Sequence, residues 1–159
     1  MFKKMVSCLL VTLGLMTAAM ADRVLQDTNG HATRLSELHG KWVIINYWAP
    51  WCGICVGEIP AINQFYRRLQ GKNAVLFGVD FDHVSTATLQ QTIRELHITY
   101  PVLRDDPNSI WGLGSIDVVP MIFFINPEGT VVKTLTGSYS ADSLLDTLQD
   151  LQNAGKQAN

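Results

Sequence analysis

The sequence predicts an α/β fold in which a mixed central sheet is covered by helices on both faces. Apolar runs of strand length alternate with stretches whose apolar residues recur at three- and four-residue spacing, as on one face of a helix. A tight turn and a returning strand follow the last of these runs, which closes the sheet with an antiparallel hairpin. The 159 residues are enough for one domain with one core.

The first elements lead to a strand-to-helix junction. Residues 23–26 and 31–35 are predicted strands of an N-terminal hairpin, because Asn-Gly at 29–30 is a strong turn signal. Residues 42–47 form an apolar run rich in β-branched residues and are the first core strand. A helix is predicted from there to about residue 70, with its inner face marked by Ile59, Ile62, Phe65, Tyr66 and Leu69.

The second half of the chain repeats the alternation of strand and helix. The run at 74–79 is too continuous in apolar residues to have a solvated face. Next come a helix from an N-cap at Ser85 to about His97, a short extended piece at 100–103, a turn and helix start at 105–108, and a brief helix at 110–113. The last predicted elements are a core strand at 118–125, its antiparallel neighbour at 130–135, and a final helix capped by Ser140.

Residues 1–21 differ in kind from the rest and predict a secretory signal peptide. Lys3 and Lys4 precede a 14-residue apolar stretch, and Ala19-Met20-Ala21 is a small-x-small cleavage pattern. We expect cleavage after Ala21, a single domain at 22–159, and a periplasmic or other extracytoplasmic location. The alternative is a retained membrane anchor, although the stretch is shorter than the roughly 20 residues that span a bilayer.

Charge and cysteine count narrow the function. Without the leader, 10 basic residues remain against 14 acidic ones, which argues against a nucleic-acid partner. Only Cys52 and Cys55 remain as cysteines, too few for a cysteine-rich zinc site. The four histidines show no metal-ligand spacing, so we expect no metal and no cofactor. A structural disulfide is the alternative, but this pair closes almost no loop, so redox chemistry is favoured.

The Cys-x-x-Cys spacing at a helix start suits a dithiol that opens and closes. Unpaired backbone N–H groups and the helix dipole favour an anion at Cys52, which makes the thiolate available as a nucleophile. Cys55 lies one turn further and resolves the mixed disulfide that forms on Cys52.

Several segments together resemble a known family. Residues 48–55 read Trp-Ala-Pro-Trp-Cys-Gly-Ile-Cys, and Glu58-Ile59-Pro60 follows. Asn46 precedes the aromatic pair, residues 98–103 look like a Phe-Pro-Val-type segment, and residues 119–129 are similar to a Val-Pro-x-x-Phe-x-Ile-Asp-x-x-Gly run. In this order they resemble the thioredoxin superfamily, and within it the TlpA/ResA/DsbE branch of exported thiol-disulfide oxidoreductases, over nearly all of residues 22–159.

The resemblance implies a three-layer thioredoxin-like fold with an N-terminal β-hairpin and a redox disulfide Cys52–Cys55. It also implies that Val119–Pro120 is a cis peptide facing the cysteines, although a trans proline is the general default. A substrate segment then pairs with the backbone of Val119 as an added strand. Trp51 is predicted to be a partly exposed platform for substrates.

Glu58 is predicted to be the third catalytic residue. It falls three residues after Cys55, on the same helical face, and the resemblance implies that its carboxylate takes and gives protons for Cys55. Cytosolic thioredoxins usually place a buried Asp where this chain has Asn46, which cannot titrate. The alternative is an ordinary solvated helix glutamate.

The leading hypothesis is a monomeric enzyme that exchanges electrons with protein thiols and disulfides. The resemblance favours a reductant, for example of apocytochrome c cysteines, supplied by a membrane-embedded thiol donor. An oxidant or isomerase of protein disulfides is the first alternative. A copper or haem chaperone using the thiols as soft ligands and a thiol peroxidase are the others.

Overall fold

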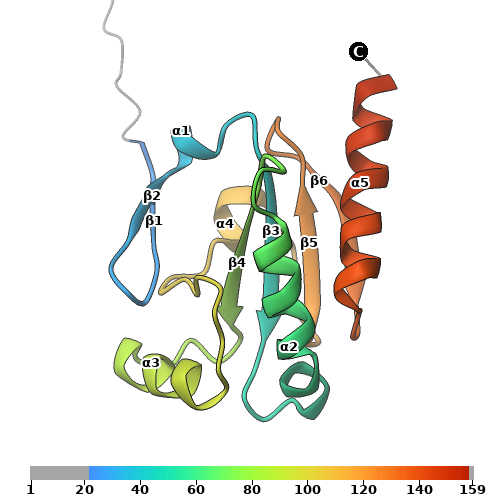
Figure 1. The fold of residues 1–159 in the computed structure, drawn as a ribbon. Coiled ribbons are helices and arrows are strands. Elements are labelled where there is room, and N and C mark those ends of the chain that lie inside the picture. Colours follow the sequence, from blue (N-terminus) through green and yellow to red (C-terminus); the bar gives the residue numbers. More distant parts are fainter. Residues whose placement is uncertain (1–21, 158–159) are drawn as a thin grey trace, which may run out of the picture.

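The computed structural model describes residues 22–157, so the predicted leader at 1–21 lies outside the described residues. Its elements are β1 (Val24–Gln26), β2 (Ala32–Arg34), α1 (Leu35–Leu38), β3 (Trp42–Trp48), α2 (Gly53–Arg68), β4 (Ala74–Asp80), α3 (Thr86–Glu95), α4 (Asn108–Trp111), β5 (Met121–Ile125), β6 (Val131–Thr136) and α5 (Ala141–Gln157) (Figure 1). Within the described range, no helix has both the length and the apolar character that crossing a bilayer requires.

The predicted mixed sheet is confirmed. Its strand order is β4-β3-β5-β6, with β3 parallel to β4 and antiparallel to β5. β5 and β6 form the predicted closing hairpin, and β1 and β2 pair separately as the predicted N-terminal hairpin. Because β3 lies inside the sheet and all seven of its residues are buried, it is a rigid support for whatever follows its C-terminal end.

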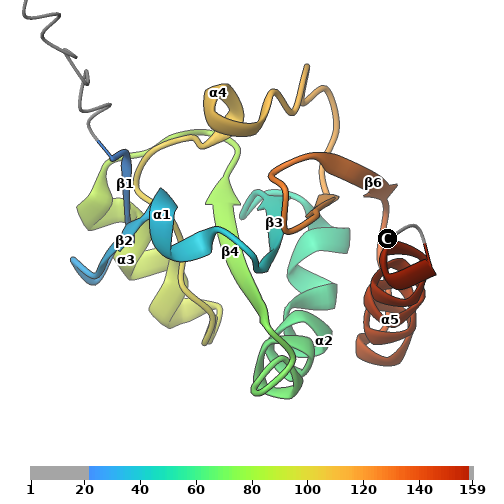
Figure 2. The same cartoon turned by 90° about the horizontal axis from the view of Figure 1, so that it is seen from above.

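The sheet buries one core on each face, because side chains alternate along β3. We call the side covered by α2, α3 and α5 the α2 face, and the side covered by β1, α1 and α4 the hairpin face (Figure 2). The buried apolar strand residues of the α2 face are Trp42, Ile44, Trp48, Leu76, Ile122, Phe124 and Leu135. Those of the hairpin face are Leu25, Val43, Ile45, Tyr47, Phe77, Val79, Phe123 and Ile125.

One predicted boundary is wrong, for a physical reason. The core strand expected at 118–125 begins only at Met121, because Val119–Pro120 is a cis peptide and proline has no N–H for a ladder hydrogen bond. The helix start expected at 105–108 agrees with α4, which begins at Asn108 and ends at Trp111, before the left-handed Gly112. The extended piece at 100–103 makes only isolated bridges, from Val102 to Gly78 and from Leu103 to Asp27.

Candidate active site

The two cysteines lie where β3 gives way to α2, as predicted. Cys52 is the N-cap of α2, and the backbone N–H of Cys55 donates to Cys52 Sγ over 3.2 Å. The two sulfurs form a disulfide, with the Cα atoms 5.2 Å apart. Cys52 is 8% exposed and Cys55 only 1%. An incoming sulfur can therefore reach Cys52, whereas Cys55 can react only with a sulfur already attached to Cys52.

The local electrostatics favour a negative charge on Cys52 when the pair is reduced. The sulfur sits at the helix N-terminus, where the dipole is positive and a backbone N–H points at it. The first turn of α2 contains no acidic residue that would oppose this charge. Since the thiolate is the nucleophilic form, Cys52 has the properties of the attacking sulfur.

Val119–Pro120 is a cis peptide, as the resemblance implied. Cys52 Sγ lies 3.6 Å from the Val119 carbonyl oxygen, although 67 residues separate the two in sequence. Pro120 is buried and Val119 is half-buried. The chain therefore turns beside the disulfide and presents the backbone of Val119 next to Cys52.

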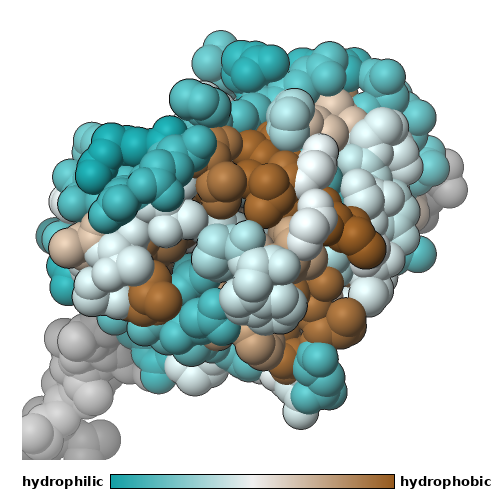
Figure 3. All heavy atoms as spheres, turned by 90° about the horizontal axis from the view of Figure 1, so that it is seen from below, coloured by the Kyte–Doolittle hydropathy of each residue, from teal (hydrophilic) through white to brown (hydrophobic). Residues whose placement is uncertain are grey.

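An apolar surface surrounds the disulfide. Trp51 is 64% exposed, Ile54 61% and Val118 46%, and apolar side chains gather at this end of the molecule (Figure 3). The indole ring of Trp51 is held in place by two contacts. Its Nε1 donates to Asp82 Oδ2 over 2.7 Å, and it packs edge-to-face with Phe81, with the ring centroids 6.2 Å apart. The sequence places Asp80 and Asp82 alternately at a strand end, which predicts polar turn residues rather than a metal or acid–base site, and it gives no sign of this contact between Asp82 and Trp51.

Glu58 is buried, as predicted, and its environment is unusual for a carboxyl group. It is 3% exposed, and neither carboxylate oxygen has a partner within hydrogen-bonding distance among residues 22–157. Burial raises the pKa of Glu58 from 4.5 to about 7, and the nearby Ser138 hydroxyl and Tyr139 backbone offset only part of that effect. A group with this pKa can both accept and release a proton near neutral pH.

Asp80 is a second buried carboxyl group, although its position with Asp82 at a strand end predicts polar turn residues. It ends β4, is 3% exposed, and accepts a hydrogen bond from the Val84 N–H over 3.2 Å. Burial raises the pKa of Asp80, and this hydrogen bond works in the opposite direction. Unlike Glu58, Asp80 has a fixed partner, so its role is to shape the loop that carries Asp82.

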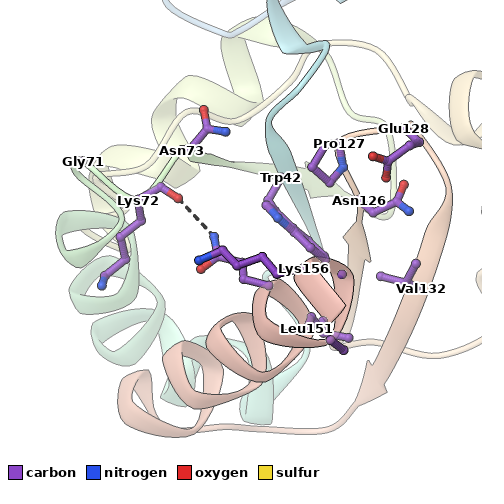
Figure 4. Close-up of a pocket in the computed structure, with 13 residues that line it drawn as sticks. Trp42, Gly71, Lys72, Asn73, Asn126, Pro127, Glu128, Val132, Leu151 and Lys156 are labelled. Carbon is purple, nitrogen blue, oxygen red and sulfur yellow. Dashed lines mark hydrogen bonds between the residues drawn. The ribbon is translucent and has the colours of Figure 1, made fainter. Parts of the chain in front are cut away.

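The histidines and a pocket at the far end of β3 lie apart from the disulfide. All four histidines are exposed. Among residues 22–157, no group of three or more His, Cys, Asp or Glu side chains is arranged to hold a metal ion. One pocket has Trp42, Leu151 and Val132 among its walls, with Lys72, Lys156 and Glu128 also lining it (Figure 4). Trp42 starts β3, so this pocket is at the opposite end of the strand from the disulfide.

Comparison with known proteins agrees with this site. A family model described as the AhpC/TSA family matches residues 16–134. The thiol-disulfide oxidoreductase ResA of Bacillus subtilis is 31% identical over 123 residues, which cover 77% of this chain and 68% of ResA.

Two solved structures show the same fold. The pneumococcal exposed lipoprotein thioredoxin Etrx1 from Streptococcus pneumoniae is 30% identical, has a TM-score of 0.69, and is matched over 82% of this chain and 99% of its own. A secreted Mycobacterium tuberculosis disulfide oxidoreductase homologous to E. coli DsbE is 22% identical with a TM-score of 0.59, over 77% of this chain and 91% of its own.

Proposed function

We propose that this chain, which belongs to the AhpC/TSA family and is a thioredoxin-like thiol-disulfide oxidoreductase, reduces protein disulfides. We also propose that it does so outside the cytoplasm. An exposed lipoprotein and a secreted protein among the similar structures support an extracytoplasmic location. The domain at 22–159 would then act after the leader at 1–21 is removed, on substrates such as the haem-binding cysteines of apocytochrome c. A membrane-embedded thiol donor would re-reduce it.

The observation that carries this proposal is the position of Cys52 between a helix N-terminus and the cis peptide at Val119. In the first step the Cys52 thiolate attacks one sulfur of a substrate disulfide. The substrate S–S bond breaks, a mixed disulfide forms on Cys52, and the released substrate thiolate takes up a proton.

In the second step Glu58 receives a proton from the buried Cys55 thiol. The Cys55 thiolate then attacks Cys52 Sγ, the Cys52–Cys55 bond forms, and the second substrate sulfur leaves as a thiol after protonation. Two electrons have passed from the protein to the substrate. Glu58 suits this role because it lies one helical turn from Cys55 and has a pKa of about 7.

Trp51, Val119 and Pro120 form the proposed substrate-binding surface. The exposed ring of Trp51 provides apolar contact area that the Asp82 hydrogen bond keeps in one orientation. The backbone of Val119 offers main-chain hydrogen bonds to an extended substrate segment, and the cis geometry at Pro120 keeps it beside Cys52. Recognition through backbone and apolar contacts would allow more than one protein substrate.

A trapping experiment tests the direction of electron flow. The Cys55→Ser variant cannot resolve mixed disulfides, so substrates should accumulate on Cys52 and be identified by mass spectrometry. A Cys52→Ser, Cys55→Ser double variant is the control for non-specific capture. Thiol alkylation of the wild-type protein in its compartment should find the pair reduced. A pair that rests oxidised would overturn the reductant role and favour an oxidant or isomerase.

The role of Glu58 is tested separately from the role of the cysteines. We expect Glu58→Gln to slow thiol-disulfide exchange about tenfold or more near neutral pH, because Cys55 loses its proton acceptor. Asn46→Ala, at the buried strand position that cannot titrate, should mainly lower stability. Equal exchange rates for Glu58→Gln and wild type at every pH would contradict the assignment.

A further inference from the structure

Exposed large apolar side chains are concentrated around the disulfide. Five of them occur among residues 22–157, and three of the five are Trp51, Ile54 and Val118. Trp51 and Ile54 lie on either side of Cys52 in sequence, and Val118 precedes Val119, whose carbonyl oxygen is 3.6 Å from Cys52 Sγ. Apolar groups that gather on a surface mark a place that a partner covers, so this patch is a docking surface for the segment that carries the reacting sulfur.

The segments that build this surface contain carboxylates but no lysine or arginine. Neither basic residue occurs in residues 42–66, 73–93 or 105–132, which supply the cysteines, the loop after β4 and the cis peptide. Two exposed aspartates border the apolar side chains there. Asp82 accepts a hydrogen bond from Trp51 Nε1 over 2.7 Å, and Asp117 directly precedes Val118.

The basic residues that flank these segments in sequence are directed elsewhere. The guanidinium of Arg104 donates to Gln26 Oε1 over 2.6 Å, in the N-terminal hairpin. Arg94 is in the last turn of α3, at the other end of that helix from the loop after β4. Lys133 pairs with Phe124, on the half of β5 that is remote from the cis peptide. None of these three therefore neutralises the two aspartates beside the disulfide.

His83 is the only residue of the three segments, apart from the carboxyl groups, whose charge could change the balance. Its Nε2 atom lies 3.6 Å from Asp106 Oδ2, so the charge of a protonated imidazole is matched by the carboxylate that it faces. The rim of the apolar patch therefore keeps a net negative charge.

An apolar centre with a polar or charged rim is the usual anatomy of a protein–protein interface. The apolar centre excludes water from the reacting sulfurs, and the charged rim attracts a partner of opposite sign and repels one of the same sign. Figure 3 shows both parts, since hydrophilic residues border the apolar surface at this end of the molecule. The segment that fits has apolar side chains at its centre and positive charge beyond them.

We propose that Ile54, Val118 and Asp117 determine substrate specificity, and that they select protein segments with an apolar residue next to the reacting cysteine and a lysine or arginine further out. This inference rests on the proposed function, because the selected cysteine is the one that forms the mixed disulfide with Cys52. Ile54 and Val118 contact the apolar neighbour of that cysteine. Asp117 faces the basic residue, and Asp82 adds to the negative charge on the side of Trp51.

Kinetics with matched peptide disulfides test the charge selection. Two peptides that differ only in Lys or Glu two residues from their cysteine are each joined to 2-mercaptoethanol through a disulfide and mixed with the reduced protein. At low salt we expect the Lys peptide to be reduced about tenfold faster than the Glu peptide. The ratio should fall toward one in 1 M salt, where charges are screened. Equal rates at low salt would overturn the charge selection.

A pair of charge variants locates the effect. Asp117→Lys should abolish or reverse the preference for the Lys peptide. Asp150→Lys makes the same change of net charge at an exposed position of α5 and should leave the preference in place. Equal loss of preference in the two variants would show that only the overall charge matters and would contradict the role of Asp117.

The apolar selection is tested with peptides that have Val or Ser next to the cysteine. In Val118→Ser and Ile54→Ser the ratio of the two rates should fall about threefold, because apolar contact with Val is lost. The ratio is informative even for Ile54, since any change in the reactivity of the neighbouring sulfurs affects both peptides alike. Val132→Ser, on β6, is the control, because Val132 is 41% exposed but lies in a segment remote from the disulfide. Unchanged ratios in Val118→Ser and Ile54→Ser would overturn the apolar selection.

Failure of this inference is distinguishable from failure of the proposed function. A protein that reduces the uncharged 2-hydroxyethyl disulfide but treats all four peptides alike retains its exchange chemistry and lacks the specificity proposed. If the cysteine pair instead rests oxidised in its compartment, the reductant role fails. The same peptides, supplied as thiols to the oxidised protein, then decide the specificity in the opposite direction of electron flow.

Discussion

The two faces of the central sheet bury apolar side chains alike but treat buried polar groups differently. On the hairpin face, the Tyr47 hydroxyl donates to Asp106, and buried Asp27 accepts hydrogen bonds from the N–H groups of Asn29 and His31. On the α2 face, the Glu58 carboxylate and the Tyr100 hydroxyl have no partner within hydrogen-bonding distance among residues 22–157. Both faces use some buried polar groups to fix loops, as Asp80 on the α2 face does by accepting from the Val84 N–H. The α2 face differs in that the buried carboxyl group beside the disulfide, Glu58, has no such fixed partner.

The largest expected effect tests whether the faces really are alike in apolar packing. Phe124 on the α2 face and Phe123 on the hairpin face are 0% and 2% exposed. Replacing either with Ala should lower the free energy of unfolding by about 3–5 kcal/mol, because each leaves a cavity. Chemical denaturation of the oxidised protein measures both. A loss at Phe123 less than half of that at Phe124 would show that the hairpin face is more loosely packed.

The next largest effect is the change of stability with pH that is caused by Glu58, the buried carboxyl group of the α2 face. The unfolded chain loses the Glu58 proton near pH 4.5, whereas the folded protein keeps it to about pH 7. The folded state therefore binds more protons in this interval, and stability falls as pH rises from 4.5 through 7. The total loss should be about 3 kcal/mol.

The matched variant Glu58→Gln removes this dependence. Its stability should change less between pH 5 and 8 than that of the wild type, and it should be the more stable protein at pH 8. Denaturation curves of the oxidised proteins, in which neither cysteine titrates, measure the difference. Parallel stability curves for the two proteins would mean that Glu58 is solvated in the folded state.

Gly78 offers a smaller test of the space beneath Tyr100. Gly78→Ala places a Cβ 2.7 Å from the Tyr100 ring and should lower stability by about 1–3 kcal/mol. The control is Gly57→Ala, in α2, where nothing lies within 4 Å of the new Cβ. There the helix should gain about 0.5–1 kcal/mol. A neutral Gly78→Ala would show that Tyr100 moves aside easily.

The smallest effect tests the partnered tyrosine of the hairpin face. Tyr47→Phe removes the hydrogen bond to Asp106 and should cost about 1 kcal/mol. In an Asp106→Ala background the same change should cost close to nothing, since the partner is already gone. The double-mutant cycle therefore measures the coupling energy of the pair. Equal losses in both backgrounds would show that the hydroxyl contributes nothing to stability through Asp106.

Much of the fold could be predicted, because its signals are local. The Asn-Gly turn, the Ser85 N-cap and the strand-to-helix junction at Cys52 each depend on neighbouring residues, and each prediction is confirmed. The start of β5 was misplaced because a cis peptide interrupts a continuous apolar run. Apolar residues before Met121 look like strand in the sequence, whatever their backbone geometry.

The sequence by itself determined where the reactive sulfurs lie, since Cys-x-x-Cys at a strand-to-helix junction puts Cys52 at a helix N-terminus through spacing alone. The family resemblance implied Val119 beside Cys52, but only the tertiary structure decided the contact of Asp82 with Trp51 and the position of Tyr100 over Gly78. The physical reason is that periodicity and capping act between near neighbours, whereas these contacts join segments far apart in the chain. Their positions are set by how the sheet and helices pack, which no local pattern records.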